Sequence, residues 1–185
     1  SLAPTNITTF IFDCFGVVCE PAMYGWYRDH RLVHGFIDEN LEAVFREFDL
    51  GNVSEEEIVT YFSKYEGVGS PKEKIAEEID GYLKIDVGLV LLIKKLRRNG
   101  FKTALLSNAN HTFFDRKVYT TYPEFKNLFD EIVISSAVGM VKPNADIYEY
   151  TLEKMNSAAA ESLFIDDSAV NVEAAIRLGM KGFLY

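Results

Sequence analysis

The sequence predicts an α/β fold: a doubly wound parallel sheet into which a helical cap is inserted. After residue 86, short runs rich in β-branched and aromatic residues alternate with helical patterns, as in parallel sheets with helices on both faces. Between about 21 and 84 the pattern is helical throughout. We therefore divide the chain into an α/β core of residues 1–18 and 86–185 and a helical cap of residues 19–85.

The composition is ordinary for a globular protein, and its charge argues against non-specific binding to nucleic acids or membranes. The 185 residues include 28 acidic and 19 basic side chains, a net charge of −9, which disfavours non-specific binding to nucleic acids and anionic lipids. We expect neither a signal peptide nor a membrane span, since no apolar run approaches ~20 residues. We interpret Cys14 and Cys19 as reduced thiols and predict a cytoplasmic protein.

The first strand is expected at 7–12, and the helices of the cap follow it. Residues 38–48 place apolar side chains at helical spacing. Ser54 and Glu57 form the capping-box pattern that begins a second helix, because each side chain can bond to the backbone of the other residue. A third helix is expected at 71–83, after a proline that suits a helix start.

The second part of the core alternates between helices and strands. The expected helices cover 88–99, 145–155 and 169–178, and the expected strands cover 102–106, 131–134, 162–165 and 182–185. The stretch 110–127 is expected to be helical or looped. We expect the first strand at the centre of the sheet, between the strands that lead to Ser107 and Asp166.

Polar side chains follow three of the expected strands. These are Asp13, Ser107 with Asn108, and Asp166 with Asp167. In a doubly wound sheet the carboxyl ends of the strands meet at one edge, where such folds bind their ligands. Carboxylates that meet there repel each other unless a cation joins them, and hard oxygen ligands favour Mg²⁺ over zinc.

A lysine is placed to reach the same edge. Lys142 follows an expected strand and loop, and Pro143 disfavours helical backbone at Lys142. The alternative is an ordinary solvated loop lysine. For Asp166 and Ser168 the alternative is capping of the helix that follows, and both roles are compatible.

Four motifs occur in the order seen in one known family. They are Phe10-Ile-Phe-Asp13-x-x-Gly16-Val-Val, Leu105-Leu-Ser107-Asn108, Gly139-x-x-Lys142-Pro143-x-x-x-Ile147-Tyr148 and Phe164-Ile-Asp166-Asp167-x-x-x-Asn171. With them the chain resembles the haloacid dehalogenase-like hydrolase superfamily, of the small helical cap type, over essentially its whole length. The last two motifs resemble those of bacterial glucose-1-phosphate-type sugar phosphatases and of the phosphatase domain of soluble epoxide hydrolases.

The resemblance implies a role for each polar strand end. Asp13 would be the nucleophile, attacking phosphorus to give an aspartyl-phosphate. Ser107, helped by the backbone N–H of Asn108, would bind phosphoryl oxygens, and Lys142 would neutralise charge on Asp13 and the phosphoryl group. The implied substrate is a small phosphorylated metabolite.

The resemblance also implies a bound Mg²⁺. Asp13, Asp167 and Asp166 would hold it, together with the backbone carbonyl of Phe15. The metal would hold nucleophile and phosphate together.

Phe15 departs from the family pattern, in which most phosphatases carry an aspartate that acts as general acid and base. Loss of such a group typically costs ~10²–10⁴-fold in rate. Phe15 therefore predicts a preference for good leaving groups, such as those of anomeric sugar phosphates or acyl phosphates.

Two rival functions remain open. An aromatic residue at position 15 also fits a metal-free 2-haloacid dehalogenase, although such a site gains nothing from the Asp166–Asp167 pair. The other rival is a weakly active or non-catalytic binding or regulatory protein that keeps the fold.

The cap offers two further patterns. Tyr24, Trp26 and Tyr27 either line a substrate pocket or form the cap core, and we favour the core. His30 and His34 have a spacing that can ligate a metal, but the segment lacks the glutamate of a zinc protease motif, so we do not expect a metal there.

Overall fold

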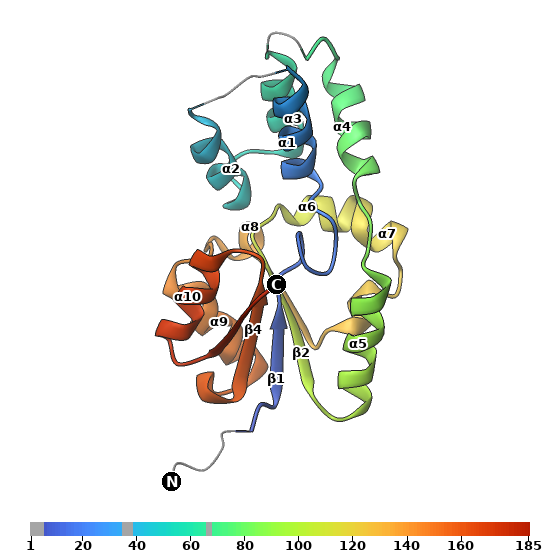
Figure 1. Cartoon of the computed structure of the whole chain (residues 1–185). Helices are drawn as coiled ribbons and strands as arrows, with labels where there is room; N and C mark the ends of the chain where they lie inside the picture. The colour runs from blue at the N-terminus through green and yellow to red at the C-terminus, as the bar shows by residue number, and fades with distance from the viewer. Residues whose placement is uncertain (1–5, 35–38, 66–67) are drawn as a thin grey trace.

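The computed structural model describes residues 6–34, 39–65 and 68–185 of the chain. Within these residues a five-stranded parallel sheet has the order β3-β2-β1-β4-β5 (Figure 1). Its strands are β1 (Thr9–Phe12), β2 (Lys102–Ser107), β3 (Glu131–Ile134), β4 (Ser162–Asp166) and β5 (Lys181–Leu184). The first strand lies between those that end at Ser107 and Asp166, so the predicted strand order is confirmed.

Strands β2 and β4 each run one residue further than predicted. Ser107 pairs with Ile134, and Asp166 pairs with Leu184, so both polar residues belong to the sheet. A change from apolar to polar side chains does not interrupt backbone pairing, which is why the apolar pattern placed both strand ends too early.

Helices cover both faces of the sheet, as predicted for a doubly wound fold. Along β1, Phe12 lies in the apolar layer shared with α5 (Val87–Arg98). Its neighbour Ile11 lies in the opposite layer, with α9 (Ala145–Met155) and α10 (Ala169–Arg177). Figure 1 shows α5 on one side of the strands and α9 and α10 on the other. Side chains that alternate along a strand thus build two apolar layers.

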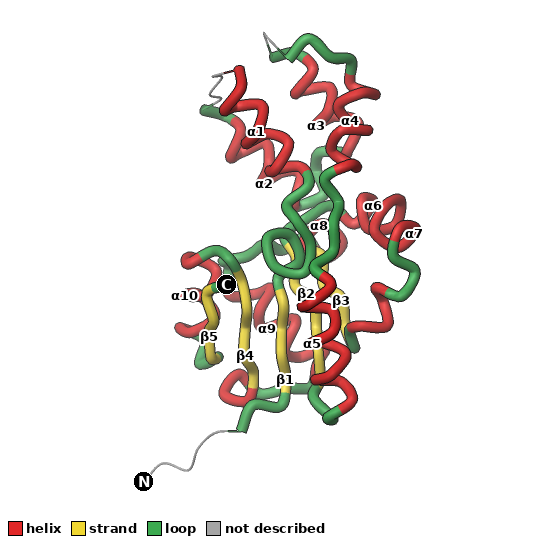
Figure 2. Tube along the Cα trace, turned by 45° about the vertical axis from the view of Figure 1, so that its right-hand side comes forward, coloured by secondary structure: helices red, strands yellow, loops and turns green. Residues whose placement is uncertain are grey.

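The inserted segment is helical and stands over the carboxyl ends of the strands (Figures 1 and 2). Its helices are α1 (Met23–His34), α2 (Leu41–Asp49), α3 (Glu55–Ser63) and α4 (Lys72–Gly81). Every helix in the described part of the chain is too short or too polar to cross a bilayer.

The aromatic residues of α1 divide between two environments. Trp26 and Tyr27 are buried in the cap core as expected, whereas Tyr24 is 56% exposed. The Trp26 indole donates to Glu78 at 2.8 Å and stacks on the His30 ring at a centroid distance of 3.9 Å. His30 therefore packs within the cap, and the side chain of His34 lies outside the described residues.

The two connections between the insert and the sheet pair with each other. Cys19 forms an antiparallel bridge with Ile85, and the N–H of Glu20 donates to the carbonyl of Lys84 at 2.8 Å. This paired hinge fixes how the cap meets the core. Our division of the chain after residues 18 and 85 stays a prediction. Cys19 and Cys14 are both buried and free.

Short helices fill connections at both edges of the sheet. Between β2 and β3 lie α6 (His111–Phe113), a π-helical turn η1 (Phe114–Val118), α7 (Tyr119–Thr121) and η2 (Phe125–Leu128). After β3 the chain forms α8 (Ser135–Val138), and η3 (Ala159–Glu161) leads into β4. We expected a loop in place of α8, because four residues are too few to show a helical period.

The predicted capping box is present and gives a stability prediction. The Ser54 hydroxyl accepts from the Glu57 N–H at 3.0 Å, and the Glu57 carboxylate accepts from the Ser54 N–H at 3.3 Å. We expect Ser54→Ala to lower the free energy of unfolding by about 1 kcal/mol. Ser54→Asp, which keeps a capping oxygen, should lose much less. Urea denaturation measures both, and equal stability of Ser54→Ala and the unaltered protein would contradict the prediction.

Candidate active site

The three predicted polar strand ends meet at one edge of the sheet. Asp13, Ser107 and Asp166 are all buried there, at the ends of β1, β2 and β4. The N–H of Asp13 donates to the carbonyl of Ile165 at 2.8 Å, so pairing of β1 with β4 continues past the last residue of β1. This backbone bond brings the carboxylates of Asp13 and Asp166 together.

The ammonium group of Lys142 joins these strand ends. Its Nζ donates to Oδ1 of Asp13 at 2.9 Å, to Oδ2 of Asp166 at 2.8 Å and to the carbonyl of Leu106 at 2.9 Å. The lysine residue is 4% exposed. An ammonium has three donors, and here each has a partner, as a buried charge requires. The alternative of a solvated loop lysine is thus excluded.

Asn108 holds the backbone of Lys142 in place. Its side-chain amide donates to the Lys142 carbonyl and accepts from the Lys142 N–H, both at 2.9 Å. We expected only the backbone of Asn108 to contribute. Sequence reasoning missed the side-chain contact, because no local pattern links residues 34 positions apart.

Asp166 is held on three sides. Besides Lys142, it accepts from the Ser168 N–H at 2.8 Å and from the Asn171 side chain at 3.1 Å. Ser168 is also the N-cap of α10, accepting from the Asn171 N–H at 3.4 Å. The capping and site interpretations therefore hold together.

The carboxylates of Asp13, Asp166 and Asp167 form a candidate cation site. Their oxygens lie within 4.8 Å of one another, and Asp167 is the exposed member. With one lysine among them, the ionised cluster carries an excess of negative charge. Hard oxygen donors of this kind fit Mg²⁺. Gly16 leaves room for the Asp167 carboxylate, because a Cβ at position 16 would lie 2.1 Å from Oδ2 of Asp167. Its φ of +95° also favours glycine.

Burial and charge shift the pKa values of this cluster. Burial raises the pKa of Asp13 to about 7, against the attraction of Lys142. Burial also raises the pKa of Asp167. For Asp166 the cost of burial is outweighed by Lys142 and by its hydrogen bonds, so its pKa is lowered. For Lys142 the two buried carboxylates outweigh burial and raise its pKa. The raised pKa keeps the Lys142 ammonium charged, and the carboxylates of Asp13 and Asp166 share that one positive charge.

Ser107 has an unused hydroxyl. Its Oγ is buried and has no hydrogen-bond partner, whereas the other buried side-chain nitrogen and oxygen atoms of the described residues each have one. An unpaired buried hydroxyl costs free energy, so such groups are normally satisfied by protein, water or ligand. Its place at the end of β2, next to the Asp13 strand, suits a bond to a ligand held at Asp13.

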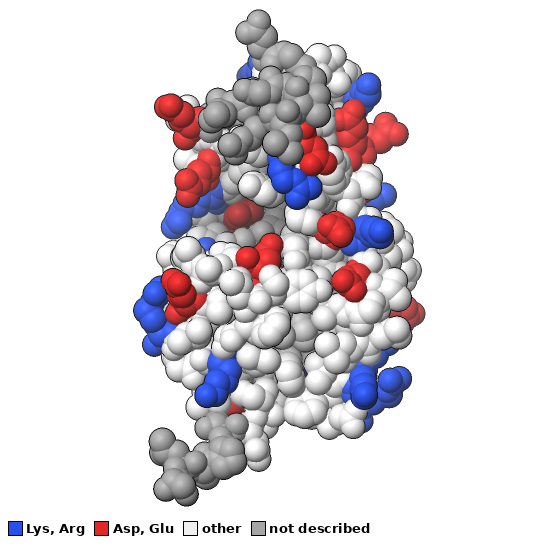
Figure 3. All heavy atoms as spheres, viewed as in Figure 1, with Lys and Arg blue, Asp and Glu red and all other residues white. Residues whose placement is uncertain are grey.

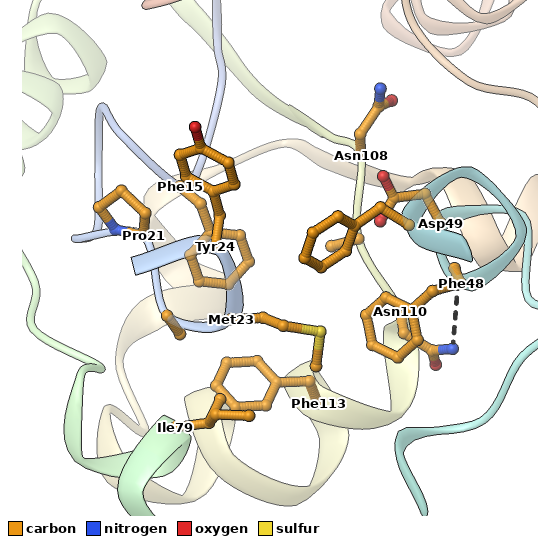
Figure 4. Close-up of a pocket in the computed structure, with 13 residues that line it drawn as sticks. Phe15, Pro21, Met23, Tyr24, Phe48, Asp49, Ile79, Asn108, Asn110 and Phe113 are labelled. Atoms are coloured by element: carbon orange, nitrogen blue, oxygen red, sulfur yellow. Dashed lines mark hydrogen bonds between the residues drawn. The ribbon is translucent and has the colours of Figure 1, made fainter. Parts of the chain in front are cut away.

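Phe15 packs among aromatic side chains. Its ring centroid lies 5.8 Å from that of Phe113 and 5.7 Å from that of Phe114. The ring belongs to the wall of a pocket of about 260 Å³ between cap and core (Figure 4). Figure 3 shows the surface hollowed between cap and core, with acidic side chains at the hollow.

Asp49 is a carboxylate of this pocket that sequence reasoning missed. It ends α2 in the cap and lines the pocket together with Asn108 (Figure 4). Burial raises the pKa of Asp49 to about 7, although the charge of Lys142 acts in the opposite direction. An acidic residue near a helix end is common on protein surfaces, so no signal in the sequence distinguished it.

Comparisons with known proteins find phosphatases among the relatives of this chain. At 29% identity over 141 residues, the chain resembles the sesquiterpene phosphatase astK of Aspergillus oryzae, covering 75% of this chain and 70% of that protein. It is 24% identical over 165 residues to phosphatase MT3486 of Mycobacterium tuberculosis, covering 86% of this chain and 68% of that protein.

Solved structures show the same fold. The HAD family enzyme bt-2542 of Bacteroides thetaiotaomicron superposes with a TM-score of 0.77 at 22% identity, covering 96% of this chain and 93% of that one. Its complex with magnesium and inorganic phosphate superposes with a TM-score of 0.73 at 21% identity, with the same coverage. The haloacid dehalogenase-like hydrolase family matches residues 7–179, a span that contains the whole carboxylate and lysine cluster, and the chain belongs to that family.

Proposed function

We propose that this hydrolase is a Mg²⁺-dependent phosphatase that acts on a small phosphorylated metabolite through an aspartyl-phosphate on Asp13. The observation that carries the proposal is the Lys142 ammonium bonded to both Asp13 and Asp166, with the unpaired Ser107 hydroxyl beside them. The relatives named as phosphatases support this reaction class.

The residues divide the work as follows. The Asp13 carboxylate attacks phosphorus, the bond from phosphorus to the leaving oxygen breaks, and its electron pair leaves with that oxygen. Lys142 and the Ser107 hydroxyl stabilise charge on the phosphoryl oxygens, which is electrostatic catalysis by groups already in place. Water then attacks the aspartyl-phosphate, giving inorganic phosphate and the restored carboxylate.

Asp13, Asp167 and Asp166, with the backbone carbonyl of Phe15, would hold the Mg²⁺. When bound, the ion would offset the negative charge of the carboxylates and the phosphoryl group. Asn108 acts through Lys142, since its amide bonds position the lysine backbone. The resemblance to sugar phosphatases implies a sugar phosphate as substrate, and this stays a prediction.

The nucleophile gives the first functional prediction. Against a panel of phosphorylated metabolites with Mg²⁺, we expect Asp13→Asn to lower kcat/KM by about a thousandfold or more, because the uncharged amide oxygen is a far weaker nucleophile than a carboxylate. Asp146→Asn is the matched control, an exposed aspartate on α9. Turnover of 2-haloacids without Mg²⁺, and none of phosphates, would favour the dehalogenase instead.

Ligand binding separates a phosphatase from a non-catalytic relative. Beryllofluoride with Mg²⁺ should raise the melting temperature of the unaltered protein and not that of Asp13→Asn, because the acyl-phosphate mimic forms on the aspartate. A shift without turnover of any phosphate would favour the weakly active or regulatory alternative.

Gly16 gives a prediction for metal binding. Gly16→Ala places a methyl group in the position of the Asp167 carboxylate, so we expect Mg²⁺ affinity measured by calorimetry to fall about tenfold or more. Gly81→Ala is the control, because a Cβ there meets nothing within 4 Å. Unchanged affinity in Gly16→Ala would remove Asp167 from the proposed ligands.

A further inference from the structure

The pocket between cap and core adjoins the proposed phosphoryl site. Phe15 and Asn108 line it, and each is close in sequence to a group of that site, Asp13 and Ser107 respectively. A phosphoryl group held at Asp13 would therefore direct its substituent towards this pocket. Asp13 itself is not part of the wall, so the pocket accommodates the rest of the substrate rather than the phosphate.

The wall of the pocket offers few groups for hydroxyls. Ten of the thirteen lining residues are apolar or aromatic, and the polar groups are the side chains of Asp49, Asn108 and Asn110 and the hydroxyl of Tyr24. Both amides are already engaged: Asn108 with Lys142, and Asn110 with the backbone oxygens of Phe48 and Val53 and with Thr112. A sugar placed here would find only the Asp49 carboxylate and the Tyr24 hydroxyl for its several hydroxyls, whereas a hydrocarbon needs no such partners.

We infer that the substrate is the phosphate monoester of an apolar alcohol whose hydrocarbon part fills this pocket. The inference rests on the proposed function and names the substrate class for that site. A volume of about 260 Å³ limits the hydrocarbon to a short chain or small ring. Four phenylalanine side chains from cap and core, Phe15, Phe45, Phe48 and Phe113, supply much of the contact surface.

The test measures binding separately from turnover. n-Alkylphosphonates from ethyl to octyl, which cannot be hydrolysed, are titrated by calorimetry in the presence of Mg²⁺. Affinity should rise about fourfold for each methylene until the pocket is full, and an alkylphosphonate should bind more tightly than a sugar phosphonate of similar size. A flat series, or tighter binding of the sugar compound, would overturn the inference.

Variants of the wall link the effect to the pocket. Ala22→Leu, which fills space, and Phe45→Gln, which adds a polar group, should both reduce the gain per methylene. Ala160→Leu, an exposed alanine in η3, should leave it unchanged. Acetyl phosphate turnover is followed in parallel: its absence would overturn the proposed function, while the phosphonate series would still decide the substrate class.

A different observation concerns proton transfer to the leaving group. The core has no acid at position 15, where Phe15 packs against aromatic rings. Asp49 is the carboxylate in the wall of the pocket, and its backbone is fixed to the core. Its carbonyl accepts from the Ser135 hydroxyl at 2.5 Å, and that of the preceding Phe48 accepts from Asn110 at 3.3 Å.

The geometry points to Asp49 as the general acid and base of this site, supplied by the cap. In the first step its carboxyl group donates a proton to the leaving oxygen while the bond to phosphorus breaks and the electron pair stays on oxygen. In the second step the Asp49 carboxylate takes a proton from the attacking water, which returns it to its starting form. The pKa near 7 allows both steps at neutral pH. The facing ionisable groups are Lys142, whose charge lowers this pKa, and Tyr24 in the pocket wall.

Leaving groups of different basicity test this role. With alkyl phosphates, Asp49→Asn should lower kcat/KM by ~10²–10⁴-fold and remove the decrease in rate above about pH 7. With p-nitrophenyl phosphate, whose leaving group needs no proton, the loss should be much smaller. Glu42→Gln, exposed on the same helix, is the control.

A merely structural role would lower both rates equally, so equal losses, or no loss with alkyl phosphates, would overturn the assignment. A strong preference of the unaltered protein for p-nitrophenyl phosphate over alkyl phosphates would also overturn it, because that preference is what Phe15 alone predicts. No turnover of p-nitrophenyl phosphate by the unaltered protein would instead overturn the proposed function.

Discussion

The site depends on one buried ammonium group. Lys142 bonds to Asp13 and Asp166 and to the carbonyl of Leu106, so a single side chain ties together the ends of β1, β2 and β4. Burying these charges costs several kcal/mol per ion, and only complete pairing offsets it. Removing the lysine would leave carboxylates buried without a counter-ion, a loss of about 3–5 kcal/mol. The two hydrogen bonds from the Asn108 amide to the Lys142 backbone help to keep the lysine where this pairing is possible.

The parallel sheet makes this convergence possible. Because β2, β1 and β4 run side by side in one direction, their last residues share an edge although they are far apart in the chain. The helical insert leaves and rejoins the core at that same edge, through the hinge where Cys19 pairs with Ile85. The core therefore supplies Lys142 and the carboxylates bonded to it, and the cap supplies most of the pocket above them, including Asp49.

Local patterns predicted much of this arrangement. The apolar pattern predicted the bounds of β3 and α9, and the side chains suited to capping predicted the capping box at Ser54. Because the carboxyl ends of parallel strands share one edge, the sequence also predicted that Asp13 and Asp166 lie together. The side-chain contribution of Asn108 and the partial burial of Asp49 were not predictable in this way. Both arise from contacts between segments distant in sequence, which change the environment of a side chain without changing its local pattern.

Phe15 explains why an acid would be better placed in the cap than in the core. A carboxylate at that position would stand among the rings of Phe113 and Phe114 and add a negative charge next to the Asp13 cluster, where burial already raises the pKa of Asp13. The Asp49 carboxylate on α2 avoids that repulsion, because its pKa is set by burial and by the charge of Lys142. It also makes proton transfer depend on the cap being seated on the core, so chemistry would be limited to substrates already shielded from water.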